Sequence, residues 1–201
     1  MALIDDIRAF EPRCPQEEVD RLLMLERLEA DPLAFDRTSP LHFTASAWTV
    51  DPKGEQTLLV YHNIFDSWSW VGGHADGEQN LAAVAKRELA EETGVTAAWL
   101  VNMGMNRIFS LEAVPVAGHM RHGQWVSSHA HLNVTYLFIA NPDDPIRPQL
   151  DENSGVRWVG LDEVIPLSTE PWICERCYKK LIAHTREVLY KDPAERCGNA
   201  R

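Results

Sequence analysis

The stretch that decides the fold of this chain is residues 73–95, GHADGEQNLAAVAKRELAEETGV. Its middle predicts a helix over residues 81–93. Asn80 suits the N-cap position, and Gly94 suits the left-handed residue that ends a helix. At about 100° per residue, one side of this helix is an apolar stripe made of Leu81, Val84, Ala85 and Leu89. That stripe predicts a helix packed against a hydrophobic core.

Three carboxylates project onto the same half of the helix as the stripe. Glu88, Glu91 and Glu92 are spaced i, i+3 and i+4, so they are neighbours that repel one another. They also lie in the last turns, where the helix dipole disfavours each anion by roughly 0.3–1 kcal/mol. Carboxylates turned toward the protein at this cost predict a divalent cation, and oxygen ligands favour Mg²⁺ or Mn²⁺. The other interpretation is a solvated acidic face with an Arg87–Glu91 pair.

In this frame the stretch resembles the Nudix box, Gly-x5-Glu-x7-Arg-Glu-U-x-Glu-Glu-x-Gly-U, in which U is a bulky apolar residue. Eight of its nine defined positions match without an insertion: Gly73, Arg87, Glu88, Leu89, Glu91, Glu92, Gly94 and Val95. The exception is Gln79, which stands where the pattern has its first Glu, with Glu78 beside it.

The resemblance implies a Nudix fold, an α/β class structure with an α/β/α sandwich around a mixed β-sheet. It also implies divalent-metal hydrolysis of a diphosphate bond in a nucleoside diphosphate linked to another group. In similar proteins the residues that match Glu88, Glu91 and Glu92 hold or work beside the metal, and Glu88 is our choice for deprotonating water. The match to Arg87 orients these carboxylates, and the backbone carbonyl at Gly73 joins the metal shell.

A further acidic ligand is expected outside the box. Similar proteins often place one in a loop before a late strand, and here Asp151 and Glu152 precede the strand expected over residues 156–159. Glu152 is our first choice and Asp151 the second. The other interpretation is an ordinary acidic loop.

Composition sets the outer limits. The chain has 201 residues, 45% of them hydrophobic, enough for one core in one domain with extensions. We expect an N-terminal helical extension over residues 1–40, a Nudix domain with a closing C-terminal helix over 41–191, and a loose tail over 192–201. The net charge of −11 argues against a nucleic-acid polymer as partner. Neither a signal peptide nor a membrane span is evident, so we expect a cytoplasmic protein; a homodimer is left open.

Hydrophobic periodicity predicts the remaining elements. An amphipathic helix is expected over residues 16–29, with Val19, Leu22, Leu23 and Leu28 as its apolar positions. A hairpin is expected from strands 42–50 and 56–62, and a closing helix over 175–190. Residues 97–105 are expected to form a strand, and 114–123 a loop.

The clearest alternation covers residues 127–139. Ser127, His129, His131, Asn133 and Thr135 share one face, while the opposite face is largely apolar, so we expect a solvent-exposed face and a packed face. The exposed face is either an ordinary polar sheet surface or the floor of a substrate cleft, with His129, His131 and Asn133 binding substrate. Trp70 either stacks on a nucleotide base or packs in the core.

Two other functions stay open. An isopentenyl diphosphate isomerase-like enzyme needs a catalytic Cys upstream of the box, and Cys14 is the only candidate. A non-hydrolytic nucleotide-binding module is favoured only by Gln79.

Cys174 and Cys177 have half of a zinc-site spacing without its other half. The pair is therefore either two ordinary reduced thiols or a metal or redox site. The substrate itself is not determined.

Overall fold

The computed structural model describes residues 2–104, 106–121 and 123–189, and the predicted tail over 192–201 lies outside them. Its strands are β1 (Leu41–Val50), β2 (Gln56–His62), β3 (Ser67–Ser69), β4 (Val71–His74), β5 (Trp99–Leu100), β6 (Ile108–Val116), β7 (His119–Arg121), β8 (Gln124–Val126), β9 (His129–Ile139) and β10 (Asn153–Gly160). Its helical segments are α1 (Leu3–Arg8), α2 (Pro15–Ala30), α3 (Leu81–Thr93), η1 (Leu161–Glu163), α4 (Val164–Leu167), α5 (Pro171–Ile173), η2 (Cys174–Tyr178) and α6 (Lys179–Leu189).

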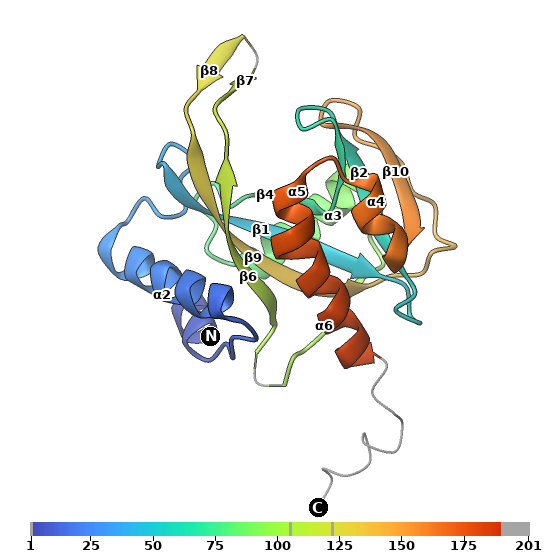
Figure 1. Ribbon diagram of the computed structural model, residues 1–201, viewed down its shortest axis with the longest axis horizontal. Coiled ribbons are helices and arrows are strands. Elements are labelled where there is room, and N and C mark those ends of the chain that lie inside the picture. The colour runs from blue at the N-terminus through green and yellow to red at the C-terminus, as the bar shows by residue number, and fades with distance from the viewer. Residues whose placement is uncertain (1, 105, 122, 190–201) are drawn as a thin grey trace, which may run out of the picture.

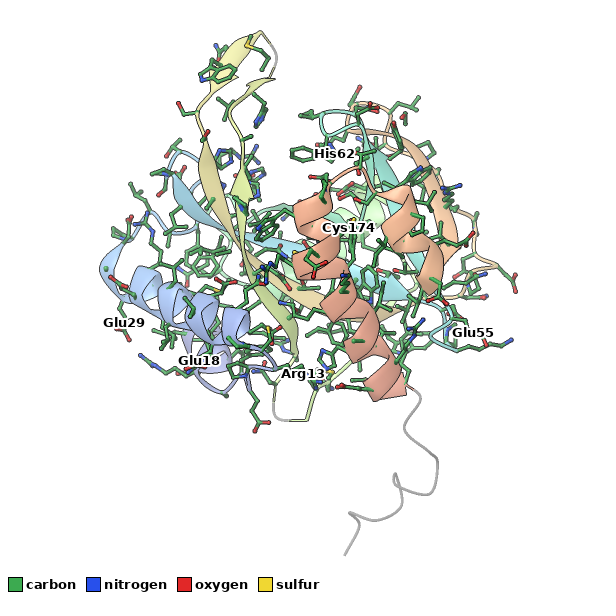
Figure 2. All side chains as sticks on the ribbon, in the orientation of Figure 1. Arg13, Glu18, Glu29, Glu55, His62 and Cys174 are labelled. Carbon is green, nitrogen blue, oxygen red and sulfur yellow. The ribbon has the colours of Figure 1, made fainter. Side chains whose placement is uncertain are left out.

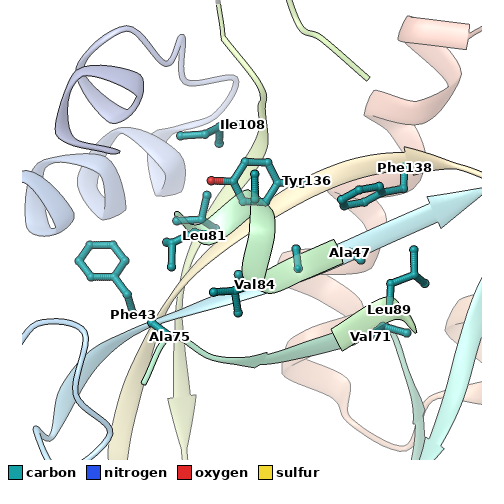
Figure 3. Close-up of a cluster of buried hydrophobic side chains, with 14 of the residues drawn as sticks. Phe43, Ala47, Val71, Ala75, Leu81, Val84, Leu89, Ile108, Tyr136 and Phe138 are labelled. Atoms are coloured by element: carbon teal, nitrogen blue, oxygen red, sulfur yellow. The ribbon is translucent and has the colours of Figure 1, made fainter. Parts of the chain in front are cut away.

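Helix α3 has the predicted bounds and caps. The Asn80 side chain accepts a hydrogen bond from the Ala83 N–H, and Gly94 ends the helix at φ +77°, a conformation that L side chains rarely adopt. The apolar stripe is buried and packs on one face of the sheet, against residues of β1, β4 and β9 (Figure 3). The pattern of residues 81–93 is therefore confirmed as a core-facing helix.

The main sheet is mixed and has eight strands. Its central path runs β10-β2-β1-β9-β5, with β3 paired to β2, β4 to β1 and β6 to β9. The long β1 and β9 run parallel, from Leu41 beside Ala130 to Val50 beside Ile139, and the other strand pairs are antiparallel. The two-stranded β7–β8 hairpin projects beyond this sheet (Figure 1).

Helices cover both faces of the sheet, so the predicted α/β/α sandwich is confirmed. Helix α3 lies behind the sheet in Figure 1, and the segment from α5 to α6 lies in front. Leu132 and Val134 of β9 belong to the core cluster on the α3 side, whereas Leu137 belongs to the cluster on the α6 side. The alternation of a strand therefore directs even-numbered residues of β9 between 132 and 136 toward α3, and odd-numbered ones toward α6.

Helix α2 packs along β6, and the predicted Leu23 and Leu28 do pack against the core, but the other two predicted apolar positions are exposed. Val19 and Leu22, expected to be buried, are 65% and 52% exposed, whereas Glu17 and Asp20 are buried. The reason is tertiary: Glu17 Oε1 lies 3.1 Å from Lys180 Nζ, so the acidic side of α2 faces α6. Arg13, just before α2, also pairs with Glu187 near the end of α6 (Figure 2).

Two other local expectations are wrong. The strand expected over 97–105 is only the two-residue β5, and strands β6 and β7 occupy most of the loop expected over 114–123. Most of β6 is buried on both faces, so it lacks the alternation that marks a half-exposed strand. Cys174 and Cys177 are buried free thiols on η2, and burial raises the pKa of Cys177. No helix in the described part of the chain is long and apolar enough to cross a membrane.

Candidate metal centre

Three carboxylates converge beside the C-terminal half of α3. Glu88 and Glu92 come from neighbouring turns of the helix, and Glu152 comes from the loop before β10. One oxygen of each lies within 4.8 Å of the others. Glu92 is buried, Glu88 is half-buried and Glu152 is exposed, so the group opens to solvent on the side of Glu152. We call these three residues the carboxylate cluster.

Glu91 lies outside the carboxylate cluster. Its side chain is 58% exposed, and its Oε2 lies 3.8 Å from Arg87 Nε. Glu91 and Glu92 are about 100° apart around the helix, so only one of them can face β4 and β10. The expectation that Glu91 faces the protein is therefore wrong, and for this residue the alternative of an exposed ion pair with Arg87 describes the structure.

Gly73 and Arg87 fix the position of Glu88. A Cβ at Gly73 would lie 2.3 Å from the Glu88 carboxyl carbon, so any side chain at position 73 would displace that carboxylate. Arg87 Nη2 donates a hydrogen bond to Glu88 Oε1 at 2.9 Å. On the other side, Asn153 Nδ2 donates to the backbone carbonyl of Glu92 at 3.1 Å and ties β10 to the end of α3.

The carboxylate cluster is short of positive charge. Burial raises the pKa of Glu92 to about 8, and the charges of Glu88 and Glu152 add to this rise. Burial also raises the pKa of Glu88, which Arg87 opposes. Among the described residues, no basic side chain forms an ion pair with Glu92 or Glu152. Crowded oxygen ligands without a cation of their own fit a hard divalent ion such as Mg²⁺ or Mn²⁺.

The polar face of β9 is less exposed than expected. His129 and His131 are partly exposed, but Asn133 and Thr135 are buried, and residues 127 and 128 precede the strand. Asn133 Nδ2 donates to Glu112 Oε2 at 3.0 Å, and Asn133 Oδ1 accepts from Ser46 Oγ at 2.8 Å. The exposed-face prediction is thus wrong for Asn133 and Thr135, because β1, β6 and α6 cover them with polar partners. Substrate binding by Asn133 stays a prediction.

The polar face of β9 and the carboxylate cluster lie on opposite sides of β4. Gly73 faces Glu88, whereas the next residue, His74, has its ring centroid 5.0 Å from that of His131. Successive strand residues point to opposite faces, so a ligand on the carboxylates meets His131 only around the edge of β4.

Trp70 lies on the α6 side of the sheet. Its ring packs edge-on against Tyr178, with centroids 5.0 Å apart, and its backbone N–H donates to the Tyr178 hydroxyl at 3.2 Å. This geometry is that of core packing, although the side chain keeps partial exposure. Base stacking by Trp70 remains a prediction.

Position 79 lies in the exposed loop before α3. Gln79 is exposed, and the neighbouring Glu78 Oε1 accepts a hydrogen bond from the Asn80 N–H at 2.7 Å. Glu78 therefore braces the loop at the start of α3, next to the position where the pattern has its first Glu. Arg37, which no sequence pattern marked, pairs with Asp76 in the loop before α3, and this contact is the main cause of its raised pKa.

Comparison with known proteins assigns the family. The sequence profile of the NUDIX domain matches residues 40–179. The chain therefore belongs to the NUDIX family. It is 24% identical over 128 residues to the phosphatase NudJ of Escherichia coli strain K12, which covers 61% of this chain and 72% of NudJ.

Solved structures agree on the fold. The dihydroneopterin triphosphate pyrophosphohydrolase of E. coli aligns with a TM-score of 0.55 at 13% identity, over 72% of this chain and 96% of its own. The NUDIX domain of Shewanella oneidensis NrtR, solved in complex with ADP ribose, aligns with a TM-score of 0.51 at 22% identity, over 82% of this chain and 97% of its own. The fold is thus that of NUDIX proteins.

Proposed function

We propose that this chain is a Mg²⁺- or Mn²⁺-dependent hydrolase of a diphosphate bond in a nucleoside diphosphate linked to another group. The observation that carries the proposal is the carboxylate cluster, which joins the acidic helix to a loop about sixty residues further along the chain. A structural acidic cluster would be expected to contain its own cation. Membership in a family of hydrolases supports the reaction class.

We assign the metal to Glu88, Glu92 and Glu152, with the Gly73 carbonyl completing the set. When bound, a divalent cation supplies charge neutralisation at the phosphate oxygens and lowers the pKa of a nearby water. Glu91, exposed and outside the carboxylate cluster, is assigned the weaker role of holding Arg87 in place.

Glu88 is the proposed general base. Burial raises the pKa of Glu88 and makes its carboxylate a stronger proton acceptor than an exposed one. The hydrogen bond from Arg87 Nη2 uses only one lone pair of Oε1, so Glu88 could bind the metal through one oxygen and accept a proton from the attacking water through the other. Arg87 thus orients the base, and Gly73 provides the space for it.

Phosphate release from a panel of nucleoside diphosphate derivatives, with and without Mg²⁺, tests the proposal. We expect turnover of at least one substrate with Mg²⁺, and loss of most turnover in Glu88→Gln and Glu92→Gln, which keep the side-chain shape. Glu91→Gln should lower turnover less than either. Glu175→Gln removes an exposed carboxylate elsewhere, on η2, and serves as the matched control.

The same panel separates the alternatives. Binding of a nucleotide without turnover in any condition would favour the binding module. An isomerase would convert isopentenyl diphosphate and lose this activity in Cys14→Ser. Cys14 immediately precedes α2, which packs on β6, whereas Glu88 and Glu92 lie on α3, so the structure gives the isomerase no support.

A further inference from the structure

Four imidazoles gather on the α6 side of β4, outside the carboxylate cluster. His42 comes from β1, His74 from β4, and His129 and His131 from β9. The ring centroid of His131 lies 4.9 Å from that of His42, 5.0 Å from that of His74 and 4.9 Å from that of His129. We call these four residues the histidine cluster. They come from three strands that only the folded sheet brings together.

Backbone hydrogen bonds fix the orientation of two of the rings. His42 Nδ1 lies 2.6 Å from the Ser39 carbonyl, and His129 Nδ1 lies 2.9 Å from the Ser127 carbonyl. A carbonyl oxygen only accepts, so each neutral ring carries its proton on Nδ1 and presents a lone pair at Nε2. Metal-bound histidines are typically oriented in this way by their second nitrogen.

His42 Nε2 has no hydrogen-bond partner among the residues that the structure describes. The side chain is 1% exposed, so water is not a ready substitute, and a buried polar atom without a hydrogen bond destabilises the fold. One nitrogen each from His42, His74 and His131 lies within 4.8 Å of the others. The unpaired His42 Nε2 therefore belongs to a group of three histidine nitrogens that could bind one metal ion.

The spacing and chemistry suit a transition metal better than Mg²⁺. Four nitrogens at about 2.0–2.1 Å in a tetrahedron around Zn²⁺ lie about 3.4 Å apart. The nitrogens of His42, His74 and His131 lie within 4.8 Å of one another, so ring rotations would have to bring them to that spacing. The Nε2 atoms of His129 and His131 are already 3.1 Å apart. Imidazole ligands favour Zn²⁺ and similar ions, whereas the carboxylate cluster offers only oxygen.

Burial lowers the pKa of His42 and of His131, which disfavours the protonated ring that cannot bind a metal. His184 makes a useful contrast: its Nε2 also lacks a partner among the described residues, but its ring stacks on Phe109 at 4.0 Å and it belongs to no group of metal ligands found there. A single imidazole without a hydrogen-bond partner therefore does not make a metal site. The histidine cluster differs because it places further nitrogen ligands beside such a ring.

We propose that His42, His74 and His131 form a second metal site for Zn²⁺ or a similar divalent transition ion, with His129 as the fourth ligand. The site is independent of the proposed hydrolysis. Its ion would tie β1, β4 and β9 together on the side of β4 opposite Gly73.

Zinc titration of the metal-stripped full chain tests the proposal, in millimolar Mg²⁺ so that the carboxylate cluster is occupied. We expect one equivalent of Zn²⁺ to bind, and Co²⁺ to give the visible absorption of a tetrahedral nitrogen site. His74→Gln and His131→Gln should weaken binding by at least about tenfold. His62→Gln, on β2 and outside the cluster, and the double variant Glu88→Gln/Glu92→Gln should both retain it.

A second measurement uses the unmodified protein, so its result does not depend on whether the histidine variants fold. Zinc should shift the ring ¹⁵N resonances of the histidine cluster, and the ring ¹⁵N resonances of His184 should not shift. The proposal is overturned if no Zn²⁺ or Co²⁺ binds, or if the ring resonances stay fixed. It is also overturned if binding survives both histidine variants and disappears in the glutamate double variant.

Discussion

Two groups of clustered carboxylates, on opposite faces of the sheet, differ in how their charge is balanced. On the α6 side, Lys180 Nζ lies 3.1 Å from Glu17 Oε1 and 3.0 Å from Glu112 Oε1, and both carboxylates are fully buried. On the α3 side, the one ion pair that Glu88, Glu92 or Glu152 forms among the described residues is that of Glu88 with Arg87. We call Lys180, Glu17 and Glu112 the lysine network.

The difference teaches how to separate a structural acidic group from a ligand-binding one. Burial opposes a charge on Lys180, but the attraction of Glu112 and Glu17 outweighs it and raises the lysine pKa, so the lysine network is complete within the chain. In the carboxylate cluster, by contrast, burial and like charge raise the pKa of Glu92 to about 8. The first group joins α2, β6 and α6, whereas for the second we propose a cation from solution.

The largest expected effect comes from removing the internal cation. Lys180→Met leaves Glu17 and Glu112 buried without a partner, so the free energy of unfolding should fall by about 3–5 kcal/mol. Urea denaturation measures this. The neighbouring Lys179 pairs with Glu175 at the surface, and Lys179→Met should lower stability by no more than about 1 kcal/mol. Equal effects of the two variants would show that the lysine network does not hold the helices.

Adding the external cation to the other group should have the opposite sign. At a Mg²⁺ concentration of 100 times its Kd, binding to the folded state stabilises by about 2.7 kcal/mol. Thermal unfolding after EDTA treatment should therefore show a rise in Tm with Mg²⁺ or Mn²⁺. Glu88→Gln should reduce the rise. An unchanged Tm in the parent protein, with no heat of binding for either ion, would contradict the assignment of the metal to the carboxylate cluster.

The pH dependence of stability sharpens the comparison further. Burial raises the pKa of Glu92 to about 8 in the folded protein, against an ordinary value of 4.5, so between these values the folded protein holds more protons than the unfolded one. Glu92 therefore makes the metal-free protein less stable as pH rises from about 5 to 8, by up to about 1.4 kcal/mol per pH unit.

Glu92→Gln removes this dependence, so its metal-free stability should fall less between pH 5 and 8 than that of the parent protein. The exposed Glu91→Gln is the matched control and should leave the pH slope as it is. Denaturant titrations at pH 5 and 8 measure both. A parent protein that gains stability over this range, with the same slope in Glu92→Gln, would mean that Glu92 is balanced by charges within the chain.

The smallest effect is expected at position 79. Glu78 already accepts a hydrogen bond at the start of α3, so Gln79→Glu should change kcat/KM by no more than about tenfold, or about 1.4 kcal/mol. Steady-state rates on the best substrate measure this, with Glu78→Gln as the companion variant. A gain of several orders of magnitude would show that the natural protein is impaired as a hydrolase and would favour nucleotide binding as its role.

Local sequence determined α3 and its ends. The 3.6-residue period of its apolar positions and the caps at Asn80 and Gly94 act within a few residues of one another, so they are readable without tertiary structure. The same holds for β1 and β2, which have nearly the predicted bounds. The proximity of Glu88 and Glu92 also follows from helix geometry alone.

Tertiary structure decided which polar residues face one another. Glu152 reaches the helix only because β10 pairs with β2 and Asn153 binds the end of α3. His42 meets His131 because β1 and β9 are parallel in a register that no local pattern encodes. Asn133 and Glu17 are buried because Glu112 and Lys180, far away in sequence, satisfy their polar groups. Periodicity shows which residues share a face, but the packing of distant elements determines whether that face meets water, a metal or another side chain.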